Sequence, residues 1–197
     1  LANNLKEKPY NRTFALLYRE LLKSWSSEEK LTAVESITLA DLSKQREKLL
    51  AEGQLTLFIH GNISREQAES ISSTVHATLA DMKPTSVKPI TAKRVAQGES
   101  IKTTSVAHTD SALLLYLQAD SDSPQARVET ALINELLSTP FYTQLRTEQQ
   151  LGYVVFSNFL PIGETPGVGL TVQSPTADSQ TLKQAYTAFL EGWRTEL

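Results

Sequence analysis

The sequence predicts an α+β fold with antiparallel-rich sheets and helices packed on one face. Three observations lead to this class: strand-like segments come in adjacent pairs, helical patterns are grouped between those pairs, and strand and helix do not alternate regularly. Neighbouring strands joined by a short turn pair antiparallel, whereas parallel pairing needs a long crossover. Of the 197 residues, 40% are apolar, which is enough to bury a core in one large domain or two small ones.

Four elements are predicted in the first part of the chain. Apolar residues at spacings of three and four place a helix over residues 14–25. A capping box that starts at Thr38 predicts a second helix, which should end before Gly53. Large apolar and β-branched side chains over residues 54–60 predict a strand. A serine cap then predicts a helix over residues 65–82.

A connection between two domains is predicted over residues 84–98. This stretch carries two prolines, scattered Lys and Arg, and no sustained periodicity. We place the boundary near Pro89, so that the domains are residues 1–89 and 90–197. Both ends of the chain stop in helical patterns, so we expect an internal piece of a longer protein.

In the second part of the chain, helices are predicted between two pairs of strands. Strands are predicted over residues 100–107, 111–119, 153–156 and 167–172. Pro124 can occupy the first turn of a helix, and another helix should start near Pro140. This second helix should end at Gly152, because glycine tolerates the left-handed conformation that commonly follows a last turn. Asp178 can cap a final helix.

Composition and charge limit the classes of partner. The chain has 22 acidic residues and 19 Lys plus Arg, and neither sign forms a long block, which argues against a nucleic-acid partner. No apolar run is long enough to span a bilayer, so no membrane partner is expected. The absence of cysteine excludes disulfides, thiolate metal sites and a cysteine nucleophile, and it leaves the compartment open.

Metal binding and independent catalysis are not predicted for this chain. His60, His76 and His108 lie far apart in sequence, without the spacing that puts two imidazoles on one helical face around zinc. No nucleophile elbow, phosphate-binding loop or dinucleotide-binding turn is present in the sequence. We therefore expect no metal ligand among these residues and no catalysis by a familiar route.

One segment, residues 141–156, has residues suited to contacting a peptide. Arg146 and Tyr153 are seven residues apart, about two helical turns, and can face the same side if the glycine bend turns the tyrosine back. A guanidinium and a phenol can both donate hydrogen bonds to a carbonyl oxygen as it becomes negative. The residues alone leave a second interpretation open, in which Arg146 forms a surface ion pair and Tyr153 only packs.

Residues 145–157 resemble a specific sequence motif of the pitrilysin/insulysin family of zinc metallopeptidases. The resemblance continues, in the same order, through residues 9–10, 16–22, 57–63 and 172–174, so it covers nearly the whole chain. The residues of these segments and the lack of cysteine are most similar to the bacterial members of that family. The chain therefore resembles an internal piece of the C-terminal half of such a peptidase.

This resemblance implies a fold and a place within it. The family builds its enzyme from four related α+β domains of the LuxS/metallohydrolase-like fold, two in each half, which enclose a chamber that degrades short polypeptides. Residues 1–89 would then be the latter part of the third domain, and residues 90–197 the first part of the fourth. The family's zinc ligands belong to the N-terminal half, so this piece is expected to bind no zinc and to be inactive alone.

The resemblance also assigns roles to single residues. Arg146 and Tyr153 match the family's catalytic and substrate-binding arginine and tyrosine, which contact the substrate backbone near the scissile carbonyl. Tyr142 matches the aromatic residue in the pocket for the side chain just after the cut. The implied partners are peptide substrates and the zinc-bearing N-terminal half, self-association of the piece is a further expectation, and the implied compartment is the periplasm. A non-catalytic homologue that acts as a peptide-binding or structural module is the alternative.

Overall fold

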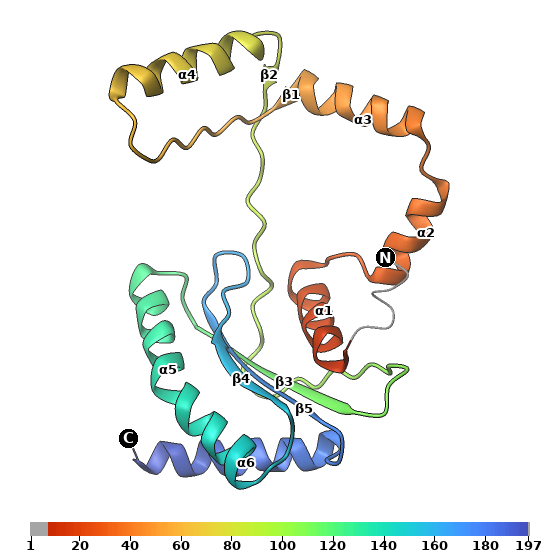
Figure 1. Cartoon of the computed structure of the whole chain (residues 1–197), viewed down its shortest axis with the longest axis vertical. Coiled ribbons are helices and arrows are strands. Elements are labelled where there is room, and N and C mark those ends of the chain that lie inside the picture. The colour runs from red at the N-terminus through yellow and green to blue at the C-terminus, as the bar shows by residue number, and fades with distance from the viewer. Residues whose placement is uncertain (1–7, 197) are drawn as a thin grey trace. The chain divides into compact units, whose positions relative to one another are not determined.

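The computed structural model describes residues 8–196 and divides into two compact units. One unit joins residues 8–31 to residues 90–196, and the other comprises residues 32–89 (Figure 1). The division after Pro89 falls where the sequence places a boundary, but residues 8–31 group with the larger unit rather than with the segment that follows them. The assignment of the two halves of the chain to the third and fourth domains of the family stays a prediction.

The smaller unit contains capped helices and one minimal strand pair. Its elements are α3 (Leu39–Ala51), β1 (Glu52–Gly53), α4 (Arg65–Thr78) and β2 (Lys83–Pro84), and α2 (Ser27–Ser36) leads into it. The two predicted N-caps are confirmed: Thr38 and Ser64 each form a capping box with the residue three positions later. β1 and β2 pair in parallel over two residues each.

The strand predicted over residues 54–60 is wrong. The segment forms no strand, and the side chain of Phe58 within it is 83% exposed. A strand needs a neighbouring backbone to complete its hydrogen bonds, and within residues 32–89 only β1 and β2 find one another. The apolar composition of this segment is therefore not sufficient to make it a strand.

A three-stranded antiparallel sheet forms the middle of the larger unit (Figure 1). Its strands are β3 (Ser111–Gln118), β4 (Val154–Phe159) and β5 (Gly167–Ser174), with β5 between the other two. All of β5 is buried, because it has a strand on each side and a helical layer on each face. Three of the predicted strands are thus confirmed, and so is the α+β class. The strand predicted over residues 100–107 is wrong, because this largely exposed segment pairs with no other strand in the described range.

Helices cover both faces of this sheet. α5 (Pro124–Tyr142) and α6 (Ser179–Glu196) pack on one face, where alternate residues of β5 join the main apolar core (Figure 1). α1 (Pro9–Leu22) packs on the opposite face around Leu21, which explains why residues 8–31 belong to this unit. The predicted arrangement with helices on one face thus describes α5 and α6, and α1 adds a second layer.

The ends of these helices are set by local backbone features. α1 stops at Leu22 because Lys23 has a left-handed backbone, with a φ of 53°, so the predicted extension to Trp25 is wrong and that side chain is 71% exposed. The predicted cap of α6 is confirmed, since the Asp178 carboxylate accepts a hydrogen bond from the N–H of Thr181 at 2.8 Å. Within residues 8–196, no helix is both long enough and apolar enough to cross a membrane.

The helix break predicted near Pro140 is also wrong. α5 runs through Pro140 and continues into a π-helix, η2 (Thr143–Glu148). Leu137, Phe141 and Leu145 recur every fourth residue along this segment, and each is at most 1% exposed. Proline in a helix interior costs about 3 kcal/mol, whereas each buried large apolar side chain contributes about 1.5–3 kcal/mol. Burial of the stripe therefore outweighs the missing hydrogen bond, and the helical segment continues.

Candidate functional site

Tyr153 lies where the long helical segment turns into β4. The turn is made by Gln150, which has a left-handed φ of 51°, and not by Gly152 as predicted. Gly152 is required for a different reason, because a Cβ at this position would lie 2.1 Å from the carbonyl oxygen of Gln173. The absence of a side chain lets the backbone pass directly against β5, which brings Tyr153 beside Gln173.

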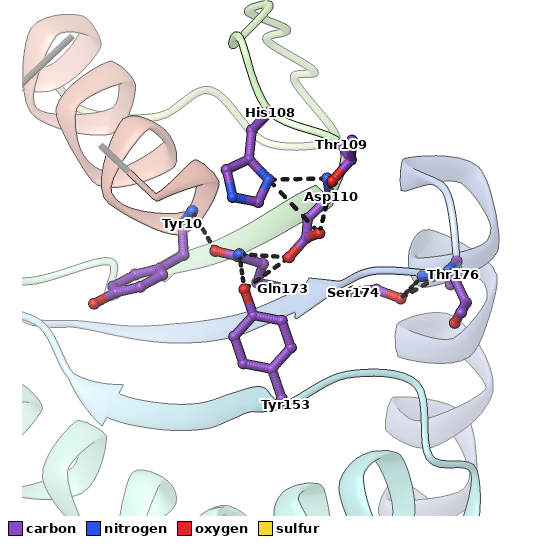
Figure 2. Close-up of polar contacts among 9 residues, drawn as sticks. Tyr10, His108, Thr109, Asp110, Tyr153, Gln173, Ser174 and Thr176 are labelled. Atoms are coloured by element: carbon purple, nitrogen blue, oxygen red, sulfur yellow. Dashed lines mark hydrogen bonds and ion pairs between the residues drawn. The ribbon is translucent and has the colours of Figure 1, made fainter. Parts of the chain in front are cut away.

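The Tyr153 hydroxyl is held by two polar side chains, although the residue is 50% exposed (Figure 2). The hydroxyl donates to Oδ2 of Asp110 at 2.7 Å, and Nε2 of Gln173 donates to the hydroxyl oxygen. Nε2 also donates to the same Asp110 oxygen at 2.8 Å. The phenol, the amide and the carboxylate therefore form a closed triangle of hydrogen bonds, which we call the Tyr153 network.

Gln173 ties this network to the centre of the sheet. It is 0% exposed and lies in β5, opposite Ala112 of β3 and Val154 of β4. Its Oε1 accepts a hydrogen bond from the backbone N–H of Tyr10, at the start of α1, at 3.2 Å (Figure 2). Because an N–H faces the oxygen and two acceptors face the nitrogen, the orientation of the amide is fixed.

Asp110 is the charged member of the Tyr153 network, and its side chain is 8% exposed. The hydrogen bond from Gln173, followed by that from Tyr153, lowers the pKa of the Asp110 carboxyl below its ordinary value. The hydrogen bond that Tyr153 donates to Asp110 raises the pKa of the Tyr153 phenol. A neutral phenol thus faces a carboxylate at neutral pH. His108 lies at the edge of the network, where its Nδ1 accepts a hydrogen bond from the backbone N–H of Asp110 at 3.0 Å.

The other two predicted site residues lie on the helical segment before Tyr153. Arg146 lies in η2 and is partly buried, and within residues 8–196 no ion pair or hydrogen bond holds its guanidinium. Tyr142 ends α5 and is 50% exposed. No hydrogen bond joins Arg146 to Tyr153 in this range. The ion pair that would give Arg146 a purely structural role is likewise not formed there.

The described residues do not make a metal centre. His60, His76 and His108 are all exposed, and no group of three or more His, Asp and Glu side chains in residues 8–196 could hold an ion. His108 and Asp110 are neighbours, but their closest nitrogen and oxygen lie 3.6 Å apart and no third ligand joins them. The side chains that the structure describes therefore do not fit a zinc site.

Sequence reasoning did not identify Asp110, Gln173 or His108 as site residues. The fold brings together Asp110, Tyr153 and Gln173, which are separated by 43 and 20 residues along the chain. The available signal was a single amide at the end of an otherwise apolar strand pattern, together with an acidic residue directly before another strand. A buried amide needs partners for both its ends, so it marks a position where polar groups meet.

Sequence comparisons relate the chain to known peptidases. A family model described as "PQQ synthase PqqF-like, C-terminal lobe domain 4" matches residues 132–197. Insulin-degrading enzyme of Drosophila melanogaster is 30% identical over 186 residues, which cover 88% of this chain and 19% of the fly protein. Protease 3 of Salmonella typhi is 29% identical over 166 residues, which cover 84% of this chain and 17% of that protein. The chain spans about a fifth of the length of these relatives.

Two solved structures resemble the fold. The crystal structure of pitrilysin matches with a TM-score of 0.78 and 24% identity, over 99% of this chain and 21% of that chain. The crystal structure of a peptidase M16 inactive domain from Pseudomonas fluorescens matches with a TM-score of 0.61 and 22% identity, over 96% of this chain and 48% of that chain. At these identities the similarity shows the fold, and it agrees with the α+β class.

Proposed function

Since this chain is homologous to the insulysin and pitrilysin peptidases, we propose that it is the substrate-binding, non-zinc segment of a zinc metalloendopeptidase. The observation that carries the proposal is Tyr153, whose ring is half-exposed while its hydroxyl is fixed by the Tyr153 network. A tyrosine that only packs would bury its ring, as Tyr186 does at 2% exposure. An exposed ring with a fixed hydroxyl is suited to contacting a ligand.

Arg146 and Tyr153 are the residues proposed to contact the substrate backbone. The Arg146 guanidinium has unused hydrogen-bond donors within the described part of the chain. Tyr153 can turn its hydroxyl proton from Asp110 toward a peptide carbonyl oxygen. Both groups would stabilise negative charge that develops on this oxygen as the peptide bond is attacked.

Tyr142 is proposed to contact the side chain that follows the cleaved bond. Its half-exposed ring ends α5, directly before the π-helix that carries Arg146. An aromatic ring provides a large apolar contact at a small entropic cost. Tyr142→Ala should therefore change the preference for that substrate side chain more than it changes cleavage of the preferred peptide.

The zinc ion of the proposed peptidase would be bound outside this chain. The described residues lack a ligand set, so no step of the reaction is assigned here to a metal held by this chain. A related protein from Schizosaccharomyces pombe, 28% identical over 182 residues, is named as a zinc protease. Metal analysis of the purified chain after dialysis should find no stoichiometric zinc, and tight stoichiometric zinc would contradict this part of the proposal.

The experiment uses a chimaera in which this chain replaces its matching segment in protease 3 of Salmonella typhi. Cleavage of a quenched fluorescent peptide gives kcat and KM. Tyr153→Phe should lower kcat by roughly 10²-fold, the usual effect of losing one hydrogen bond to a developing oxyanion, with a smaller change in KM. Arg146→Lys keeps the charge but loses the planar pair of donors, so it should also lower kcat.

Two matched controls accompany these variants. Tyr18→Phe removes a hydroxyl outside the Tyr153 network, and Arg194→Gln removes a cation from the exposed surface of α6. Both should leave kcat unchanged. Unchanged turnover in Tyr153→Phe, with an active parent chimaera, would remove Tyr153 from the proposed function.

The second candidate is a non-catalytic homologue that holds peptides or supports structure. The observation in its favour is the similarity to a solved M16 inactive domain, of which this chain covers 48%. The outer edge of β4 pairs with no strand in the described range, so an extended peptide could add there through backbone hydrogen bonds alone. Peptide binding that tolerates Arg146→Lys and Tyr153→Phe, in a folded but inactive chimaera, would favour this candidate.

A further inference from the structure

The Tyr153 network uses both ends of the Gln173 amide for hydrogen bonds. Gln173 uses its amide nitrogen twice, for Asp110 and for Tyr153, and its amide oxygen for the backbone of Tyr10. The strand that carries Gln173 is paired on both sides, so its backbone cannot shift without disturbing the sheet. The place of the Tyr153 hydroxyl is therefore set by the central strand of the sheet.

We propose that Asp110 and Gln173 are positioning residues that hold the Tyr153 hydroxyl for an incoming peptide. Gln173 fixes the phenol oxygen, and Asp110 accepts the hydrogen bond from the hydroxyl until a peptide carbonyl replaces the carboxylate as acceptor. The role of the peptide in this step rests on the proposed function. The holding of the hydroxyl does not, because it depends only on contacts within the chain.

The double use of the Gln173 amide explains how the hydroxyl can be released. When Tyr153 turns its proton to a peptide carbonyl, Asp110 loses one donor but keeps the 2.8 Å bond from Gln173. The carboxylate is then still hydrogen-bonded, which avoids the cost of leaving a mostly buried charge without a donor. No proton leaves the phenol in this exchange; only its acceptor changes.

A side chain other than glutamine would not serve at position 173. Glutamate would place a second carboxylate against Asp110, and the two negative charges would repel each other. Leucine would remove the amide bonds to Asp110 and to Tyr153 and would leave the Tyr10 N–H without its acceptor. Gln173→Glu is therefore a sharper test than truncation, since it keeps the shape of the side chain.

The first experiment measures the Tyr153 phenol in the full chain. Carbon-13 NMR of ring-labelled tyrosine resolves the six tyrosines during a pH titration, and the Tyr153 resonance is the one missing from Tyr153→Phe. Asp110→Asn keeps the shape of the side chain and removes its charge, so the pKa of Tyr153 should fall toward its ordinary value. Asp122→Asn, which removes a carboxylate that pairs with Arg94, should leave the Tyr153 titration unchanged. An unshifted Tyr153 resonance in folded Asp110→Asn overturns the inference.

The second experiment measures coupling in the chimaera. Asp110→Asn should lower kcat by between roughly ten- and a hundredfold, as expected for a misplaced contact group. In combination with Tyr153→Phe it should add no further loss, because the hydroxyl it positions is already gone. Equal losses with and without the hydroxyl would show that Asp110 acts through another group and would overturn its positioning role.

The two experiments separate the failure of this inference from the failure of the proposed function. If the Tyr153 titration shifts in Asp110→Asn but Tyr153→Phe leaves turnover intact, the positioning stands and the peptidase role of Tyr153 is lost. If the titration does not shift, the inference fails whatever the turnover shows. Gln173→Glu should disturb the Tyr153 resonance as well, and urea midpoints of all variants show which of them remain folded.

Discussion

Replacing Gly152 by alanine tests the close approach that places Tyr153. A Cβ at this position would lie 2.1 Å from the carbonyl oxygen and 2.9 Å from the carbonyl carbon of Gln173, and 3.2 Å from Cγ1 of Val172. Ordinary contacts of a Cβ begin at about 3.4 Å. The nearest two atoms belong to the backbone of β5, which is hydrogen-bonded to a strand on each side. Either β5 or the segment around Gly152 must therefore move.

The expected cost follows from two opposing terms. Overpacking a well-filled site costs about 1–3 kcal/mol, and a contact with sheet backbone belongs at the upper end of this range. Alanine also restricts the unfolded chain more than glycine does, which stabilises the folded state by about 0.4–1 kcal/mol. We therefore expect Gly152→Ala to lower the free energy of unfolding by about 2 kcal/mol, a large share of the 5–15 kcal/mol typical of a domain.

Gly192→Ala is the matched control, because it adds the same methyl group where nothing lies within 4 Å. Gly192 lies within α6, so this change should stabilise the chain by about 0.5–1 kcal/mol. Urea unfolding can be followed by the fluorescence of Trp193, which packs against the main core. Equal effects of the two variants, or a loss below about 0.5 kcal/mol in Gly152→Ala, would refute the argument for the close approach.

Three further predictions concern burial and charge. Leu145→Ala should cost about 2–5 kcal/mol because this residue is fully buried, whereas exposed Leu136 should tolerate alanine at below about 1 kcal/mol in the same urea assay. Tyr186→Phe removes a buried hydroxyl that donates to two backbone carbonyls, at 3.0 and 3.2 Å, so it should lower the free energy of unfolding by about 1–2 kcal/mol. Tyr142→Phe, at an exposed residue, should change it little. The pKa of the Asp110 carboxyl is lowered in the folded state, so the ionised carboxylate stabilises the fold fully above its ordinary pKa of 3.8. This stabilisation is lost as the pH falls through the lower pKa of the folded state. Asp110→Asn should therefore weaken the dependence of the urea midpoint on pH in this acid range.

The helices could be predicted because their signals are local. The hydroxyls of Thr38 and Ser64 reach only three residues forward, and the carboxylate of Asp178 does the same. The helix through Pro140 could not be predicted in this way. A proline signals a break by local chemistry, and only the tertiary burial of Leu145 and its neighbours shows that the break is overridden.

The strands divide according to whether a partner exists. Residues 167–174 became the central strand because two other segments lie beside them, and all eight are buried. Residues 54–60 have an equally apolar sequence but remain outside any ladder. Composition describes how well a segment would suit a sheet, and pairing depends on segments far away in the chain. The sequence pattern alone therefore does not distinguish a strand with a partner from one without.

The candidate site was predictable only in part, for the same reason. Arg146 and Tyr153 belong to one continuous sequence motif, so the resemblance to the family could identify them as candidate site residues. The chimaera experiment tests their proposed role. Asp110 and Gln173 enter through the register of the sheet, which sets Gln173 opposite Val154, the residue after Tyr153. Along β5 the odd-numbered residues face away from the main core, so Gln173 had to find polar partners on the face that α1 covers. The buried amide of Gln173 therefore meets polar groups from other segments, and one of them is the proposed substrate-contacting tyrosine.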